Sequence, residues 1–244
     1  MPLYGLIGHP LGHSWSKEYF TRLFAAENLS DHRYELFDLD DITQLPALIH
    51  DKKPLGLNVT IPYKSRILPY LNAIDDQARE IGAVNCILID DQLELTGFNT
   101  DFLAFREILE KMEFDSGTKA LVLGSGGSSR AVIAALKVSG FQWSVVSRSE
   151  QNTEYTYDTL DEEAISSHRL IINCTPSGMW PDVKTMPGIP YQFISKSHDI
   201  LDLVYNPAET LFMAECRKRG ANVQGGLDMF HLQAQLSWKI WSKR

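Results

Sequence analysis

One segment, TKALVLGSGGSSRAVIAALKVSG at residues 118–140, constrains the fold more than any other. An apolar run of strand length passes through a glycine-rich turn directly into an apolar run with helical spacing. In this context the turn brings backbone N–H groups and a helix N-terminus to a pyrophosphate, and the missing side chains allow close approach. The segment therefore predicts a dinucleotide-binding α/β unit, with a glycine-rich connection that binds no ligand as the alternative.

The strand expected next, WSVVSRS at 143–149, indicates which dinucleotide is bound. A protein that binds NAD places an aspartate or glutamate at the end of this strand to bond the ribose 2′-hydroxyl. This chain has Ser147, Arg148 and Ser149 there, with no carboxylate. An arginine can meet a 2′-phosphate with a charge-assisted fork, so the sequence favours NADP over NAD. A solvated surface arginine is the alternative.

Composition is that of an ordinary globular chain of 244 residues, with 44% hydrophobic and 22% charged residues. The formal net charge of −8 argues against nucleic-acid binding, which needs a basic surface. No apolar run approaches the roughly 20 residues that cross a bilayer, and the N-terminus does not have the pattern of a signal peptide. Cys86, Cys174 and Cys216 are widely spaced, which favours buried thiols over disulfides or a metal site. We expect a cytoplasmic protein that binds neither membranes nor nucleic acid.

The first hundred residues alternate strand-like and helix-like segments, which predicts a mainly parallel sheet covered by helices. Strands are expected at 3–8, 34–39, 55–61 and 83–89, and the last of them turns back as a hairpin that gives the sheet an antiparallel edge. A second α/β unit follows over about 102–225, with strands at 143–149, 169–175 and 199–205. The final helical segment has Met229, Leu232, Leu236 and Ile240 on a common face.

Three stretches near the N-terminus carry groups that suit a polar ligand. The first, GHSWS, places Ser14 and Ser16 at an expected helix start, where hydroxyls suit a carboxylate, although Ser16 is equally well explained as a plain N-cap. The second, NVTIPYK at 58–64, ends in Lys64, and the third, NTD at 99–101, ends in Asp101. On the residues alone, a structural ion pair between two loops is the simpler explanation of Lys64 and Asp101.

Taken together, these stretches resemble the shikimate dehydrogenase family over almost the whole chain. The motifs that carry the resemblance are S-x-S at 14–16, N-V-T-x-P-x-K at 58–64, G-A-V-N at 82–85, N-T-D at 99–101, G-x-G-G from Gly124, N-x-T-P-x-G-M at 173–179, V-Y-N-P at 204–207, and G-L-x-M at 226–229 followed by Gln233. No single motif is specific, but this many in this order is a strong signal.

The resemblance implies a two-domain α/β fold with a cleft between the domains. The substrate-binding and catalytic domain would be 1–101, joined by the C-terminal helix 226–244, and a Rossmann-type NADP-binding domain would be 102–225. The implied reaction is the NADP-dependent, reversible oxidation of shikimate to 3-dehydroshikimate, a step of chorismate and aromatic amino-acid biosynthesis, with NAD as a weaker cofactor and no metal. The implied assembly is a monomer or a homodimer.

Carried over position by position, the resemblance assigns roles to residues. Lys64 and Asp101 are the expected catalytic pair, in which the lysine stabilises a developing alkoxide and exchanges its proton while the carboxylate orients both. The residues expected to contact shikimate are Ser14, Ser16, Thr60, Asn85, Tyr205 and Gln233. Those expected to hold the cofactor are Gly124, Ser125, Gly126, Gly127 and Ser128 at the pyrophosphate, Ser147, Arg148, Ser149 and Asn152 at the adenosine end, and Leu203 and Gly226 on the nicotinamide side.

The chain departs from the family pattern at a few positions. Asn152 stands where a second arginine commonly clasps the 2′-phosphate, Glu150 adds negative charge nearby, and Phe102 follows Asp101 where glycine is preferred. These departures keep open a dehydrogenase of quinate or another cyclic polyol acid with relaxed NAD/NADP use. A non-catalytic dinucleotide-binding sensor is a further alternative, which the presence of both Lys64 and Asp101 disfavours.

Overall fold

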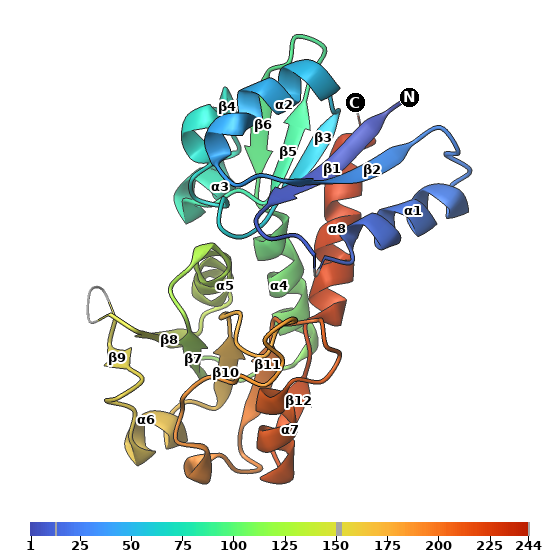
Figure 1. The fold of residues 1–244 in the computed structure, drawn as a ribbon. Coiled ribbons are helices and arrows are strands. Elements are labelled where there is room, and N and C mark those ends of the chain that lie inside the picture. Colours follow the sequence, from blue (N-terminus) through green and yellow to red (C-terminus); the bar gives the residue numbers. More distant parts are fainter. Residues whose placement is uncertain (13, 150–152, 244) are drawn as a thin grey trace. The chain divides into compact units, whose positions relative to one another are not determined.

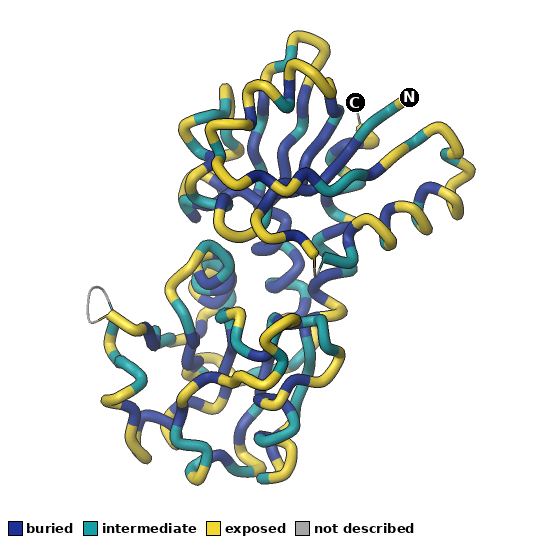
Figure 2. Tube along the Cα trace, viewed as in Figure 1, coloured by how far each residue is buried: buried dark blue, intermediate teal, exposed yellow. Residues whose placement is uncertain are grey.

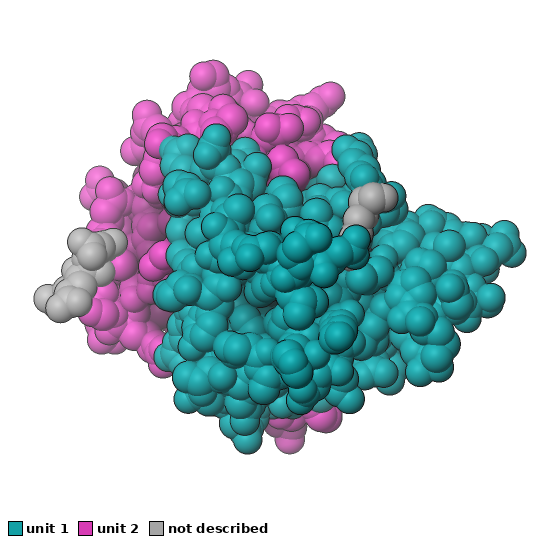
Figure 3. Space-filling view, turned by 90° about the horizontal axis from the view of Figure 1, so that it is seen from above, with its two compact units in different colours: residues 1–101, 233–244 teal, residues 102–232 magenta. Residues whose placement is uncertain are grey.

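A computed structural model of the chain describes residues 1–12, 14–149 and 153–243 (Figure 1). Contacts within the chain define two compact units, which Figure 3 colours separately. Unit 1 comprises Met1–Asp101 and Gln233–Arg244, and unit 2 comprises Phe102–Leu232. The chain leaves unit 1 within α4 (Thr100–Lys111) and returns to it within α8 (Leu227–Trp241).

Unit 1 is built on a six-stranded sheet with the order β2-β1-β3-β5-β6-β4. Its strands are β1 (Leu3–Gly8), β2 (Arg33–Asp38), β3 (Gly56–Val59), β4 (Ala73–Ile74), β5 (Cys86–Ile89) and β6 (Leu95–Phe98). Its own helices are α1 (Ser16–Ala26), α2 (Leu45–Lys52) and α3 (Asp76–Ile81), with 3-10 turns at Ile42–Gln44 and Leu68–Tyr70. The strands expected at 55–61 and 83–89 are shorter than predicted, because Thr60 and Asn85 already belong to the connecting segments.

The hairpin expected after 83–89 is present, but it does not form the edge of the sheet. β5 pairs antiparallel with both β3 and β6, and the short β4 pairs in parallel with β6. The prediction of an antiparallel edge was therefore wrong, because the reversed strand lies inside the sheet. Two reversals in succession make β6 run in the same direction as β3 and β1.

Helices cover both faces of the unit 1 sheet (Figures 1 and 2). In β3, Leu57 and Val59 join the core formed with α2 and α3, where they meet Ile49 and Ala78. Side chains alternate between the faces of a strand, so Asn58 points to the opposite face. The core of that face is formed by α1 and the last turns of α8.

The end of α8 completes this second core. Trp241 is buried, and its ring stacks on Tyr4 with the ring centroids 5.0 Å apart. Its Nε1 donates a hydrogen bond of 2.9 Å to the carbonyl oxygen of Ile87. Gly56 permits this approach, because a Cβ at that position would stand only 2.3 Å from the Trp241 Nε1. Trp241, near the end of the chain, therefore belongs to the core of the first unit.

The four apolar residues predicted on a common face of α8 are not all among its most buried residues. Of the four residues placed on a common face, Met229 is buried, whereas Leu232, Leu236 and Ile240 are only partly buried. The fully or nearly fully buried residues are Met229, Phe230, Ala234, Ser237 and Trp241. A small polar residue such as Ser237 gives no apolar signal, although its hydroxyl is satisfied inside the fold. Apolar periodicity alone therefore does not identify the most deeply buried residues of α8.

Unit 2 is built on a second six-stranded sheet, in which every pair is parallel and the order is β12-β11-β10-β7-β8-β9. Its strands are β7 (Lys119–Leu123), β8 (Gln142–Ser147), β9 (Tyr155–Thr156), β10 (Leu170–Asn173), β11 (Asp199–Asp202) and β12 (Asn222–Gln224). Its own helices are α5 (Gly127–Val138), α6 (Glu162–Ser166) and α7 (Leu211–Lys218), with a 3-10 turn at Tyr191–Phe193.

The order of these strands is that of a doubly wound dinucleotide-binding fold. The chain begins in the middle at β7, moves outward to β9, then crosses to β10 and moves outward in the other direction. The predicted α/β class with a Rossmann-type unit is thereby confirmed. Within the described part of the chain, no helix combines the length and the apolar character needed to cross a membrane.

Gly56→Ala tests the packing of α8 on unit 1. The added methyl group would overlap the buried Trp241 ring, so we expect the free energy of unfolding to fall by about 1 to 3 kcal/mol. Urea unfolding of the variant measures the loss. Gly188→Ala is the matched control, because a Cβ at Gly188 would meet nothing within 4 Å. Equal stabilities of the two variants would contradict this account of the core.

Candidate functional site

The candidate residues of unit 1 gather at one edge of its sheet. β1, β3 and β6 run in the same direction and end at this edge, and they are followed by the segments that carry Ser14, Thr60 and Asp101. Asn85 precedes the reversed strand β5 and therefore lies at the same edge. Backbone bonds tie these segments together: Thr60 N–H donates to the Ile7 carbonyl and Asn85 N–H to the Phe98 carbonyl. The carboxyl end of parallel strands is where open α/β sheets bind ligands.

Lys64 and Asp101 form an ion pair at this edge. Lys64 Nζ donates to Asp101 Oδ2 at 2.7 Å, although the two residues are 37 positions apart in the sequence. Their side chains are 14% and 8% exposed. An ion pair this far removed from water is costly to form, because two charges must lose their hydration, and one partner without the other would be costlier still. A buried pair of this kind is therefore a stronger indication of a functional site than an exposed ion pair is.

Ser14 and Ser16 lie close to each other at the start of α1. Ser14 Oγ donates to Ser16 Oγ at 3.1 Å and accepts a bond from the Ser16 backbone N–H at 3.2 Å. The helix begins at Ser16, and Trp15 occupies the N-cap position. The alternative that made Ser16 a plain N-cap is therefore wrong. The reason is that the helix starts one residue earlier than a Ser16 cap would require.

Asn85 and the N-T-D turn are joined by buried hydrogen bonds. Thr100 N–H donates to Asn85 Oδ1 at 2.6 Å, and Asn85 Nδ2 donates to Thr100 Oγ1 at 2.9 Å. Asn99 Nδ2 donates to the Ala83 carbonyl at 2.9 Å. The residue before Asp101 is thus fixed to the residue before β5. Gln233, from the returning segment of α8, belongs to the same unit.

In unit 2, the glycine-rich turn stands where the strand order reverses. It follows β7, which lies between β8 and β10, and the chain continues into α5 at Gly127. Gly124 has φ +105°, a left-handed conformation that favours glycine, and its N–H donates to the Val146 carbonyl. Ser129 Oγ donates to the Gly126 carbonyl at 2.6 Å and is fully buried. Ligands of open α/β sheets bind at this switch point.

Gly126 provides a test of whether the turn fits a dinucleotide. Its φ is −83°, which any residue adopts, and an added Cβ would meet nothing within 4 Å. Neither the backbone nor the packing of the described residues therefore requires glycine there. The missing side chain leaves open space at the N-terminus of α5, where no side chain caps the helix. A pyrophosphate fits this space and the N–H groups that face it.

The predicted adenosine-side residues follow directly after β8. Ser147 is buried at the strand end, and its Oγ lies 3.3 Å from Ser125 Oγ in the turn. Arg148 and Ser149 are exposed. Asn152 and Glu150 lie outside the described residues. The structure thus brings the end of β8 to the glycine-rich turn and leaves an arginine exposed at that position.

Leu203 and Gly226, the predicted nicotinamide-side residues, are in direct contact. A Cβ at Gly226 would stand 2.3 Å from the Leu203 carbonyl oxygen, and Gly226 N–H donates to the Val204 carbonyl. Tyr205 stacks on Phe230, with the ring centroids 4.6 Å apart. These residues surround the end of β11, in unit 2.

A buried carboxylate that no role was assigned to organises this part of unit 2. Asp202 Oδ1 accepts from Asn173 Nδ2 at 2.9 Å and from the Val204 N–H at 3.1 Å, and Oδ2 accepts from Thr210 Oγ1 at 2.6 Å. Asn173 Oδ1 in turn accepts from Thr175, whose methyl group would lie 3.0 Å from a Cβ at Gly124. Two polar residues at adjacent strand ends, Asn173 and Asp202, are the signal that would have revealed this cluster.

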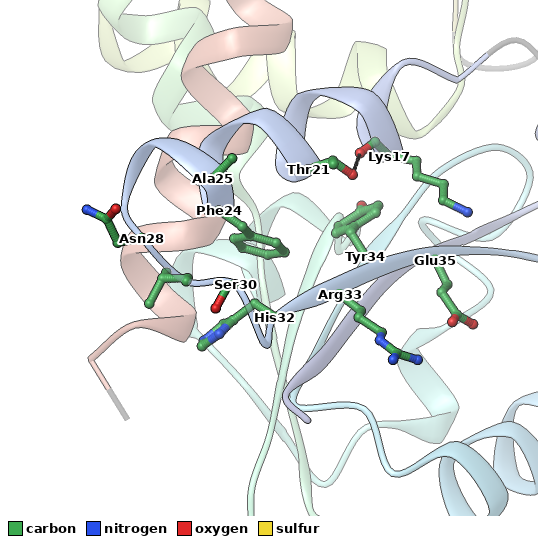
Figure 4. A pocket seen from close by; sticks show the side chains of 11 residues that line it. Lys17, Thr21, Phe24, Ala25, Asn28, Ser30, His32, Arg33, Tyr34 and Glu35 are labelled. Atoms are coloured by element: carbon green, nitrogen blue, oxygen red, sulfur yellow. Dashed lines mark hydrogen bonds between the residues drawn. The ribbon is translucent and has the colours of Figure 1, made fainter.

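A pocket of about 820 Å³ in unit 1 lies elsewhere, between α1 and β2 (Figure 4). Its lining residues are Lys17, Thr21, Phe24, Ala25, Asn28, Leu29, Ser30, His32, Arg33, Tyr34 and Glu35. It contains none of the predicted site residues. We therefore locate the candidate site at Lys64 and Asp101 and not at this pocket.

The two units together indicate a class of protein. Unit 2 has the fold and the turn of a dinucleotide-binding domain. Unit 1 carries a lysine–carboxylate pair that suits acid–base chemistry on a polar substrate, and the two features together define a dinucleotide-dependent dehydrogenase. A family model described as the shikimate dehydrogenase substrate binding domain matches residues 6–87. The chain is 37% identical over 266 residues to the shikimate dehydrogenase (NADP(+)) of Moorella thermoacetica, covering 99% of this chain and 88% of that protein. The chain belongs to the shikimate dehydrogenase family.

Solved structures of the family have the same fold. Shikimate dehydrogenase 1 of Peptoclostridium difficile superposes with a TM-score of 0.88 at 34% identity, covering 100% of this chain and 92% of that one. Shikimate 5-dehydrogenase of Thermus thermophilus, in complex with NADP(H) and shikimate, superposes with a TM-score of 0.85 at 32% identity, covering 100% and 94%.

Asp202 gives the protein a predicted pH dependence. Burial raises the pKa of this carboxyl from 3.8 to about 6, against the lowering effect of its three hydrogen bonds. The unfolded chain therefore releases the proton at lower pH than the native state does. Stability is greatest below the unfolded pKa and falls as pH rises through the folded pKa, by about 3 kcal/mol. In Asp202→Asn, the free energy of unfolding measured with urea should differ less between pH 4 and pH 7 than in the wild type. The same pH dependence of this free energy in both proteins would contradict the prediction.

Proposed function

We propose that the chain catalyses the NADP-dependent, reversible oxidation of shikimate to 3-dehydroshikimate. The observation that carries the proposal is the Lys64–Asp101 pair, held at the carboxyl edge of the substrate-side sheet of a shikimate dehydrogenase family member. The proposal assigns substrate binding to residues 1–101 with the C-terminal helix and cofactor binding to the rest. A cleft between the two parts, a cytoplasmic location and a monomeric or dimeric state stay predictions.

The substrate-side residues supply complementary groups for a hydroxylated carboxylic acid. Ser14 and Ser16 offer hydroxyls beside the N-terminus of α1, which favours a carboxylate. Thr60 and Asn85 offer a hydroxyl and an amide at the same sheet edge as Lys64. We assign further contacts to Tyr205 and Gln233, following the family motifs.

The roles proposed for Lys64 and Asp101 follow from the proton transfer that the reaction requires. Oxidation of a secondary alcohol removes a hydride from carbon and a proton from oxygen, and the bound dinucleotide supplies the hydride acceptor. In the reverse direction, the Lys64 ammonium donates a proton to the ketone oxygen. An ammonium has three N–H donors, so it can bond Asp101 and a substrate oxygen at the same time. Asp101 holds the amine in place and accepts a bond from the reacting hydroxyl.

The cofactor residues are those at the switch point of unit 2. Gly124 to Ser128 place N–H groups at the start of α5, with open space at Gly126 for the pyrophosphate. Arg148 is assigned to the 2′-phosphate, which explains a preference for NADP. Leu203 and Gly226 are assigned to the nicotinamide side, with Asn152 at the adenosine end.

A direct assay tests the function. Purified protein, shikimate and NADP should give NADPH absorbance, and absence of NADPH formation over a range of pH would overturn the proposal. The same assay with quinate and with NAD separates the alternatives. A higher kcat/KM with quinate than with shikimate would point to the polyol-acid alternative. Equal kcat/KM values with NAD and NADP would exclude the proposed contact of Arg148 with the 2′-phosphate.

Lys64→Ala should lower kcat by about 100- to 1,000-fold, because a positioned acid–base group contributes about that much. The dissociation constant for NADP should stay within about twofold, because the cofactor residues lie on unit 2. Steady-state kinetics and NADP titration measure both quantities. Lys52→Ala is the control, because Lys52 is an exposed lysine before the opposite end of β3. Unchanged turnover of Lys64→Ala would return Lys64 to a structural role.

Gly126→Ala tests the cofactor turn without any substrate. The methyl group would enter the open space and not the protein core, so the thermal midpoint should hardly change. The dissociation constant for NADP, measured by calorimetry, should rise at least about tenfold through steric exclusion. Gly188→Ala, at another glycine with no close neighbour, should leave it unchanged. Equal NADP affinity in all three proteins would exclude close approach of a phosphate to Gly126.

A further inference from the structure

A cluster of buried polar side chains lies behind the candidate catalytic edge of unit 1. It consists of Tyr34, Asn58, Asn85, Thr100 and Ser237, each with at most 5% of its surface exposed. The first four come from β2, β3, the segment before β5 and the start of α4, and Ser237 comes from α8. Polar groups at this depth are tolerated only when each finds a partner. Among the described residues, no buried side-chain nitrogen or oxygen lacks one.

Asn58 brings this cluster to α8. It occupies the strand position between Leu57 and Val59 and faces the side of the sheet that α8 covers. Its Oδ1 accepts from Tyr34 Oη at 2.9 Å, which fixes the amide with Nδ2 toward the helix. Asn58 Nδ2 then donates to Ser237 Oγ at 2.8 Å and, more weakly, to the Asn85 carbonyl at 3.3 Å.

Ser237 is the junction of the cluster. Its hydroxyl donates to the Gln233 carbonyl at 2.9 Å. That bond uses the only proton of the Ser237 hydroxyl. The Ser237 oxygen also lies 3.3 Å from Thr100 Oγ1, whose own proton is directed to Asn85 Oδ1 at 3.2 Å. One hydroxyl group thereby joins α8, β3 and the N-T-D turn. Burial raises the pKa of the neighbouring Cys86 thiol to about 12, so the thiol itself stays neutral.

The partners of Ser237 are the immediate neighbours of proposed site residues. Thr100 precedes Asp101 and is fixed to Asn85 by three hydrogen bonds. The carbonyl that accepts the Ser237 proton belongs to Gln233 itself. A shift of the hydroxyl would therefore move the Asp101 turn, Asn85 and Gln233 relative to one another.

We infer that Ser237 is a positioning residue, which sets Gln233 of the last helix in register with Asn85 and Asp101. The inference rests on the proposed function, because it concerns the residues assigned there to shikimate. Ser237 does not itself belong to that set. A neutral hydrogen-bond junction suits this task, because its bonds are directional and lose strength steeply when the geometry changes.

The kinetic test is a comparison of two KM values. Ser237→Ala removes the acceptor of Asn58 and the hydroxyl contact with Thr100, so the KM for shikimate should rise about tenfold. The KM for NADP should stay within about twofold, because the proposed cofactor residues lie on unit 2. Tyr34→Phe, which frees the far end of Asn58, should act in the same direction by about threefold. It carries the test if Ser237→Ala does not fold.

Trp241→Phe is the matched control on the same helix. It removes another buried hydrogen bond to the sheet, the one to Ile87, and should destabilise unit 1. Trp241 has no hydrogen bond to Ser237, Asn58 or Thr100 among those described, and a phenylalanine ring keeps its ring contact with Tyr34. Both KM values should therefore keep their wild-type ratio. Equal changes in the two KM values of Ser237→Ala, or the same pattern in Trp241→Phe, would overturn the inference.

Amide exchange provides a readout that needs no substrate. The Thr100 N–H, which bonds Asn85 Oδ1, should exchange at least about tenfold faster in Ser237→Ala, measured relative to the amides of β1. In Trp241→Phe the Thr100 and β1 amides should change together. If wild-type protein does not oxidise shikimate, the proposed function fails, and the exchange result alone decides whether Ser237 positions the turn. Unchanged relative exchange would exclude it.

Discussion

Two successive reversals of strand direction place the aspartate of this protein beside its lysine. β5 runs against β3, and β6 runs against β5, so β6 points the same way as β3. The segments after both strands therefore leave the sheet at the same edge, and Lys64 meets Asp101 across 37 residues of sequence. Without the inserted strand, the N-T-D turn would stand at the other end of the sheet. The candidate chemistry of unit 1 depends on this topology before it depends on any side chain.

The charged and the neutral polar residues at that edge have different roles. The ion pair supplies groups that can exchange a proton, and its two side chains keep a little contact with the surface. The fully buried layer beneath it is neutral: amides and hydroxyls of Asn58, Thr100 and Ser237 bond one another. Neutral groups avoid the large hydration cost of buried charges and still fix direction. A similar arrangement in unit 2 is built around the carboxylate of Asp202, and there the cost appears as a raised pKa.

Local features of the sequence predicted much of this structure, and long-range ones did not. The glycine-rich turn was identifiable because strand, glycines and helix are consecutive, and the same holds for most strands. The position of β5 inside the sheet was missed because the residues of a strand do not by themselves determine which strands it pairs with. Ser237 and Asp202 were missed because a polar residue in a core carries no apolar periodicity. The start of α1 was misplaced by one residue, which is the usual uncertainty of helix ends. The roles of Lys64 and Asp101 came from family motifs, since spacing alone favoured a structural ion pair.

The composition of unit 1 has a consequence for how the protein is made. Its core contains Tyr4 near the beginning of the chain and Trp241 near the end, stacked on each other. Unit 2 is one continuous stretch, Phe102–Leu232. During synthesis from the N-terminus, unit 2 therefore has all its residues while unit 1 still lacks part of its core. The ribosome completes unit 2 before unit 1, so a chain truncated before Trp241 would contain all of unit 2 but an incomplete core of unit 1.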